Sequence, residues 1–197
     1  MSTQRIESPA PSKERGILFS APMVRALLAG TKTQTRRVVK PQPITCVGWA
    51  GGAYIERRPA TMFRPAECWS ILDAKMLCPY GQPGDRLWVR ETHAYVAHSK
   101  LGFDVGSVIY RADDNAGWDG RWTPAIHMPR DASRITLEVT EVRVERLQDI
   151  SHADAMAEGM PLDDAVHDYS KLWDRINGPG GWDANPWIWA VSFRRTT

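Results

Sequence analysis

The chain has 197 residues, of which 43% are hydrophobic and 24% charged, and its formal net charge is +2 at pH 7. These values exclude a wholly disordered chain and are typical of a globular protein that buries its core without disulfide or metal staples. So small a net charge does not by itself indicate nucleic-acid binding, although the stretch from Arg15 to Lys40 holds six basic residues and no acidic one.

The start of the chain is polar and contains two prolines, so we expect residues 1–14 to form a disordered tail. This stretch lacks the apolar segment of a signal peptide, and no later apolar run approaches the length that spans a membrane. These features predict a cytoplasmic protein without membrane association.

The spacing of the cysteines and histidines matches neither a set of disulfide bonds nor a metal site. The cysteines are odd in number and irregularly spaced, which favours reduced thiols: Cys46, Cys68 and Cys78. The histidines lack the spacing of metal ligands: His93, His98 and His127. The sequence therefore predicts no metal and no other cofactor.

The first regular elements are a strand and a short helix. Residues 16–19 predict a buried strand, and Ser20, with Pro22 in the first turn, is typical of a helix start. Apolar residues follow helical spacing from 23 to 28. Gly30 predicts the end of the helix, because glycine readily adopts a positive φ.

A second strand is predicted over residues 33–39, and its first half is unusually polar. No side chain from Thr31 to Arg37 is apolar, whereas a half-buried strand alternates apolar and polar residues. Residues three apart on a strand face opposite sides, so Lys32 can approach Thr35 only from the preceding turn. Two interpretations follow, a solvated edge strand or one wall of a site.

The middle of the chain contains two predicted insertions. Residues from about 44 to 82 show no sustained periodicity, and we expect an insertion with little regular structure. The turn at residues 83–85 precedes a strand over 86–92, and another strand is predicted over 107–111. The second insertion covers about 96–130. We expect residues 15–197 to form a single domain that contains both insertions.

The last third predicts a long strand, two helices and a closing strand. Apolar residues alternate from 135 to 147, and a change of phase at 140–141 indicates a bulge. Ser151 begins a short helix that ends at Gly159, a second helix covers 162–176, and a strand covers 187–193. Many strands with few helices predict an α+β fold, a small β-barrel with short helices and loop insertions.

Glu158 is the second informative residue, because it lies in the last turn of a short helix. The helix dipole opposes a carboxylate there by about 0.3–1 kcal/mol. A nearby cation would remove this cost, and Lys32 is the candidate if the two helix ends converge. The alternative is an exposed glutamate.

The segment Leu28–Arg37 (LAGTKTQTRR) resembles the opening motif of the ASCH family. The turn at 83–85, the strand at 135–147, the segment 152–160 and the terminal hydrophobic strand extend this resemblance. The family has a β-barrel related to the PUA RNA-binding fold. The chain resembles the longer ASCH proteins of phage and prophage origin.

The resemblance implies an activity. A compact bacterial ASCH protein hydrolyses N(4)-acetylcytidine to cytidine and acetate with a lysine, a threonine and a glutamate. By resemblance these roles fall on Lys32, Thr35 and Glu158, with Asp154 as the alternative acid. Either a neutral Lys32 takes the proton of Thr35, or a charged Lys32 stabilises the oxyanion while Glu158 acts as base.

Substrate-binding residues are expected around this motif and in a polar loop. They are Thr33, Arg36, Arg37, Trp118 and Trp122. Tryptophans beside arginines can stack unpaired bases, although anchoring of the loop is the alternative role. The expected partner is a small nucleoside, RNA or single-stranded nucleic acid. The alternative functions are a non-catalytic PUA-like binding module and a metal-independent ribonuclease.

Overall fold

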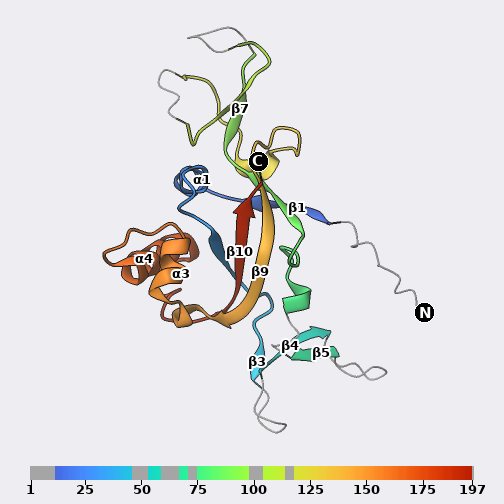
Figure 1. Cartoon of the computed structure of the whole chain (residues 1–197), viewed down its shortest axis with the longest axis vertical. Coiled ribbons are helices and arrows are strands. Elements are labelled where there is room, and N and C mark those ends of the chain that lie inside the picture. Colours follow the sequence, from blue (N-terminus) through green and yellow to red (C-terminus); the bar gives the residue numbers. More distant parts are fainter. Residues whose placement is uncertain are drawn as a thin grey trace, which may run out of the picture.

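The computed structural model of the protein describes residues 12–45, 53–58, 67–70, 75–97, 104–113 and 118–196. They form a mixed α/β structure whose largest sheet has five strands (Figure 1). Its order is β1 (Glu14–Leu18), β6 (Arg86–Arg90), β9 (Thr136–Arg146), β10 (Trp187–Arg195) and β2 (Gln34–Val38). Strands β1 and β6 are parallel, and the other neighbours are antiparallel.

The helices are few and short. Within the described residues they are α1 (Ala21–Leu28), α3 (His152–Ala157), α4 (Ala165–Asn177) and three single 3₁₀ turns, η1 (Lys75–Leu77), η2 (Ala125–His127) and η3 (Leu147–Asp149). Helices α3 and α4 lie together on one side of the large sheet (Figure 1). No helix in the described ranges combines the length and apolar character needed to cross a membrane.

The large sheet is curled, with β1 and β2 at its two ends. Arg37 on β2 donates from Nη2 to the carbonyl oxygen of Leu18 on β1, at 2.9 Å. Within the described residues no strand ladder joins these two edges into a closed barrel. The structure therefore confirms strands with few short helices, the coarser part of the prediction.

Strand β10 is buried on both faces. Trp189, Val191 and Phe193 belong to the larger core, which includes α1 and β1. Ile188 and Ala190 belong to the smaller core under α3 and α4. This position explains why residues 187–191 form a continuous apolar run instead of an alternating one.

The long strand β9 contains the bulge that the change of phase predicted. Ser192 of β10 pairs with Glu141, whereas the next residue, Phe193, pairs with Val139. Thr140 is therefore the extra residue on β9. The bulge keeps Val139 and Val142 both in the larger core although they are three residues apart.

The insertion at 44–82 has more regular structure than predicted. Three short strands form an antiparallel sheet of their own: β3 (Ile44–Thr45), β4 (Ala53–Arg58) and β5 (Glu67–Ser70). The prediction of little regular structure was wrong there, because such short strands do not establish a period. In the second insertion, β8 (Val108–Tyr110) pairs with β7 (His93–Tyr95). At the start of the chain, β1 already begins at Glu14, within the predicted tail.

Candidate functional site

The ends of α1 and α3 converge, as the predicted ion pair requires. Gly30 has φ +76°, and after it the backbone N–H of Lys32 donates to the carbonyl of Ala26. Lys32 then forms an isolated antiparallel bridge with Glu158, the residue that follows α3. This turn places Lys32 beside a residue 126 positions further along the chain.

Lys32 and Glu158 form a buried ion pair. Lys32 Nζ lies 2.6 Å from Glu158 Oε2, and the two side chains are 0% and 3% exposed. The same Nζ donates to the carbonyl oxygens of Gln34 at 2.8 Å and of Glu158 at 2.9 Å. Burial lowers the pKa of Lys32 and the Glu158 charge opposes that effect. Three acceptors match the three N–H groups of an ammonium, so the geometry favours a charged Lys32.

Gly159 permits this close approach. Its φ is +94°, and a Cβ at this position would lie 3.3 Å from the Cβ of Ala26 and 3.5 Å from that of Lys32. Any other residue would be strained by the backbone and crowded by α1. The glycine that ends α3 therefore also sets the spacing of the two helix ends.

Arg36 lies on the α3–α4 side of β2, inside a network of charges. Its guanidinium donates to Gln34 Oε1 and, at 2.8 Å, to Glu145 Oε1. It lies 3.5 Å from Glu158 Oε1, and its side chain is fully buried. Ala190 pairs with Arg36 across β10, and its small side chain leaves room for the guanidinium. Arg36 is thus a partner of carboxylates inside the protein. Its guanidinium, which was predicted to bind substrate, is already paired with Glu145 and Glu158.

Asp154 belongs to the same network, as a neighbour of the ion pair and not as a replacement for Glu158. Its Oδ1 accepts from Gln34 Nε2 at 3.1 Å and from Arg143 Nη2 at 2.9 Å. Ser151 Oγ donates to its Oδ2, at the start of α3. Partial burial raises the pKa of Asp154, but the hydrogen bonds from Ser151 and Gln34 and the arginine charges lower it to about 2.

The low pKa of Asp154 predicts a pH-dependent contribution to stability. A carboxyl whose folded pKa is about 2, against an ordinary value of 3.8, stabilises the fold fully above that ordinary value. The contribution is lost as the pH falls through the folded pKa. We expect the difference in unfolding free energy between the wild type and Asp154→Asn to shrink between these two pH values. Urea unfolding at several pH values measures it, and a constant difference would contradict the assignment.

Thr35 and Arg37 lie on the opposite face of β2, toward the larger core. Thr35 is fully buried, and its Oγ1 accepts from Arg37 Nη1 at 2.9 Å. Phe19 lies between the two cations, with its ring centre 5.7 Å from Lys32 Nζ and 5.4 Å from the Arg37 guanidinium carbon. The hydroxyl of Thr35 thus bonds to Arg37 and not to Lys32. Thr33, the remaining motif residue, is exposed.

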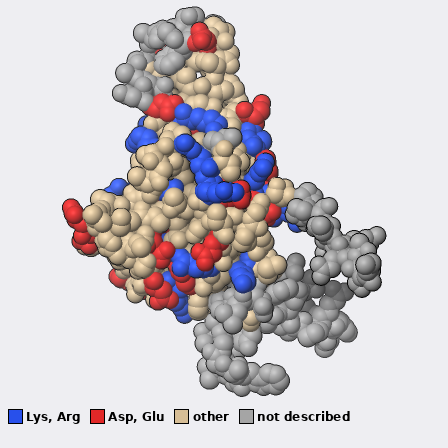
Figure 2. Space-filling model, in the orientation of Figure 1, with Lys and Arg blue, Asp and Glu red and all other residues tan. Residues whose placement is uncertain are grey.

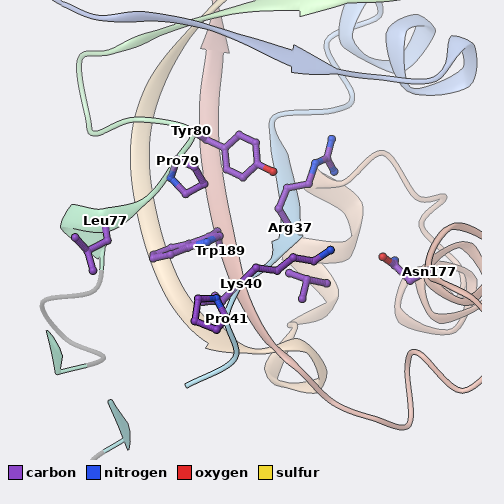
Figure 3. A pocket seen from close by; sticks show the side chains of 10 residues that line it. Arg37, Lys40, Pro41, Leu77, Pro79, Tyr80, Asn177 and Trp189 are labelled. Carbon is purple, nitrogen blue, oxygen red and sulfur yellow. The ribbon is translucent and has the colours of Figure 1, made fainter. Parts of the chain in front are cut away.

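A cavity of about 660 Å³ lies beside β2. Its described lining comes from β2 and the residues after it, η1 and the following loop, β10 and the end of α4: Arg37, Val38, Val39, Lys40, Pro41, Leu77, Pro79, Tyr80, Asn177 and Trp189. The Tyr80 hydroxyl points toward Arg37, and Asn177 stands on the far side (Figure 3). A cavity of this size suits a ligand as large as a nucleotide.

Trp118 and Trp122 are not brought to this cavity. Their rings meet edge to face with centres 6.2 Å apart, and both pack against Ala94, Val96 and Ile109 of the β7–β8 region. This position corresponds to the loop-anchoring alternative. The substrate-stacking role expected of them has no support from their placement.

The Trp118–Trp122 pair predicts an effect on stability and not on ligand binding. Trp122→Ala removes a half-buried ring from a satellite cluster, so we expect a loss of about 1–3 kcal/mol in unfolding free energy. The affinity for any ligand of the β2 cavity should stay within twofold (~0.4 kcal/mol) of wild type. Urea unfolding and a binding titration test this, and weaker binding without destabilisation would contradict it.

The metal and thiol predictions concern residues that the structure covers only in part. Within the described residues, no group of three His, Cys, Asp or Glu side chains has a metal-binding arrangement. Cys78 is buried and free, and burial raises its pKa to about 11, which disfavours a reactive thiolate. Cys46 and His98 lie outside the described residues.

Two cavity residues were missed from the sequence. Lys40 had been counted only as part of a basic stretch, and Tyr80 lay in an apparently irregular insertion. Lys40 and Tyr80 are 40 positions apart, and no sequence pattern indicates that they lie in the same cavity. Only the closeness of Lys40 to the motif in sequence could have indicated that it lies just beyond the end of β2.

Comparison with known proteins gives little. No protein-family model matches the sequence, and no curated protein matches it. Among solved structures, the chain is similar to protein EF3133 from Enterococcus faecalis V583, of the family DUF984. The two are 9% identical, and the match covers 96% of this chain and 82% of that chain with a TM-score of 0.42. This similarity is too weak to assign a function.

Proposed function

We propose that the protein is an ASCH-like amidohydrolase that cleaves the acyl amide of an N-acylated cytosine nucleoside, such as N(4)-acetylcytidine. The observation that supports this best is the buried Lys32–Glu158 pair at 2.6 Å. Removing two charges from water costs several kcal/mol per ion, and such groups concentrate at functional sites. Thr35, three positions after Lys32, is buried, and Arg37, which donates to its hydroxyl, lines a cavity that suits a nucleotide.

Thr35 is the proposed nucleophile. Because Arg37 donates to Oγ1, the proton of the Thr35 hydroxyl remains available to a base. The proposed reaction requires the Thr35 hydroxyl, now bonded to Arg37 on the other face of β2 from Arg36, to turn to the Glu158 carboxylate. Oγ1 then attacks the acyl carbon, and Glu158 takes the hydroxyl proton. The C–N bond then breaks, and that proton passes to the departing amine of cytosine.

Lys32 and water complete the cycle. Lys32 stays protonated, as its three acceptors favour, and one of its N–H groups leaves its protein acceptor to stabilise the negative oxygen of the tetrahedral intermediate. Water then attacks the acyl–Thr35 ester, Glu158 again takes a proton, and acetate leaves with the threonine restored. This scheme uses the charged-lysine alternative of the two that the sequence left open.

A PUA-like barrel is the fold proposed for this activity. The curled five-stranded sheet supports it, because the Arg37–Leu18 hydrogen bond spans its two edges. In this arrangement the polar motif forms the edge strand β2 of the barrel wall, and the larger core fills the interior beneath it.

A second candidate function is binding of RNA or single-stranded nucleic acid without cleavage. One observation favours it: Thr35 is completely buried, which is a closed environment for a nucleophile. Arg37 and Lys40 in the cavity would then serve recognition alone. Such binding would weaken steeply with salt, because phosphate contacts release counterions.

The experiment is incubation of the purified protein with N(4)-acetylcytidine, followed by chromatography of the products. Amide cleavage gives cytidine and acetate in equal amounts, and Glu158→Gln should abolish it while the protein stays folded. Lys171→Gln, an exposed change on α4, is the matched control and should keep full activity. Unchanged substrate, together with salt-sensitive RNA binding, would support the binding module instead.

A further inference from the structure

The cavity beside β2 carries positive charge that no described carboxylate neutralises. Among the described residues, Arg37 donates to neutral oxygens, those of Thr35, Arg36 and Leu18. Lys40 is exposed at the other end of the strand edge. None of the described residues that line the cavity is acidic. An anionic group on the ligand is the natural complement to such a site.

The other cavity with several arginines differs in this respect. It has a volume of about 560 Å³ and is lined in part by Arg86, Arg130 and Arg134. Arg130 pairs with Glu14 at 3.0 Å, and Arg134 pairs with Glu91 at 2.9 Å. On the face shown in Figure 2, basic side chains likewise lie beside acidic ones. Of these two cavities, the one at β2 is the one whose described arginine and lysine have no carboxylate partner among the described residues.

The walls of the β2 cavity suit a flat ring. Tyr80, Leu77 and Trp189 supply aromatic and apolar surface, and the Tyr80 hydroxyl points toward Arg37 (Figure 3). Bases stack on such surfaces at about 1–3 kcal/mol each. A ring and an anionic group in one cavity indicate a nucleotide.

The free edge of β2 offers hydrogen bonds to the base. Val39 donates from its N–H to Trp187, and Thr33 accepts from Phe193, so the odd-numbered residues of β2 bond to β10. In an antiparallel pair the alternate residues point their N–H and C=O to the other side. Val38 thus presents a donor and an acceptor along the outer edge of β2, and it lines the cavity.

We propose that this cavity binds the phosphate of the substrate at Lys40, so that the substrate is a phosphorylated cytidine unit instead of the free nucleoside. The orientation rests on the proposed function, which places the acyl group at Thr35. Thr35 and Lys40 are five residues apart, and because β2 ends at Val38 their separation is at most the roughly 16 Å of a fully extended chain. A nucleotide with its acyl group spans most of this distance, and the flexible lysine side chain covers the remainder.

The test compares cytidine 5′-monophosphate with cytidine in equilibrium titrations followed by tryptophan fluorescence and calorimetry. Neither ligand has an amide to cleave, so binding is measured apart from catalysis. We expect the monophosphate to bind at least about tenfold more tightly at low salt, and the ratio to fall as salt rises. Lys40→Gln should remove most of the preference, whereas Lys171→Gln, outside the cavity lining, should keep it.

Equal affinity for the two ligands, no binding of either, or a preference that survives Lys40→Gln would overturn the proposal. A cytidine tetranucleotide with a 5′-phosphate identifies the source of the phosphate. Tighter binding than the monophosphate assigns it to an RNA chain, and equal binding assigns it to a free nucleotide.

Hydrolysis separates this proposal from the proposed function. If the monophosphate of N(4)-acetylcytidine binds preferentially but is not cleaved, the phosphate site stands and the amidohydrolase fails. If it is cleaved with the same kcat/KM as the nucleoside, the amidohydrolase stands and the phosphate site fails.

Discussion

Replacing Lys32 with methionine is expected to lower the free energy of unfolding by about 3–5 kcal/mol. The variant leaves Glu158 buried without the ammonium that lies 2.6 Å from it, and Arg36 at 3.5 Å is a weaker partner. Methionine keeps the length and apolar stem of lysine, so the loss reports the charge and not a cavity. Urea unfolding followed by circular dichroism measures it.

The double variant Lys32→Met/Glu158→Gln distinguishes a structural pair from a functional one. With both charges gone, no uncompensated ion is buried, and we expect most of the lost stability to return. Turnover should nevertheless remain absent, since the base and the oxyanion partner are both missing. A single Lys32→Met variant as stable as the wild type, or an active double variant, would contradict this account.

Thr35→Val is expected to reduce kcat by at least about 10³-fold. Valine has the shape of threonine, and its loss of the hydroxyl removes the proposed nucleophile and one acceptor of Arg37. The expected cost in unfolding free energy is only about 1 kcal/mol, because Arg37 keeps its bonds to Arg36 and Leu18. Steady-state kinetics and urea unfolding measure the two effects separately.

Thr35→Ser is the matched control, because it restores a hydroxyl without the methyl group. It should retain activity within about tenfold of the wild type. If Thr35→Val turns over normally, Thr35 is not the nucleophile, and direct attack by water becomes the mechanism to test.

The sequence predicted most elements of the fold whose pattern is long or punctuated. The alternation and change of phase near Thr140 predicted β9 and its bulge, and Gly30 marked the end of α1. The sheet formed by β3, β4 and β5 was missed, because strands of two to six residues carry too little periodicity. Closure of a barrel depends on non-local pairing between β1 and β2, which a pattern along the chain does not specify.

The site was predictable where the position of a charged residue in a helix calls for an opposite charge nearby. Glu158 at a helix C-terminus needs a cation, and Lys32 after Gly30 was the nearest candidate in the motif. The separate roles of Arg36 and Arg37 follow from strand alternation, which turns one toward buried carboxylates and the other toward the cavity. The presence of Lys40 and Tyr80 in one cavity could not be predicted, because it depends on how the loop after η1 packs beside β2.

The most direct measurement of the central claim is multiple turnover of N(4)-acetylcytidine by the purified protein. We predict that cytidine and acetate appear in equal amounts, in excess of the protein present, and that Thr35→Val abolishes both products. Intact substrate after prolonged incubation with folded wild-type protein, or equal product yields from the wild type and Thr35→Val, would contradict it.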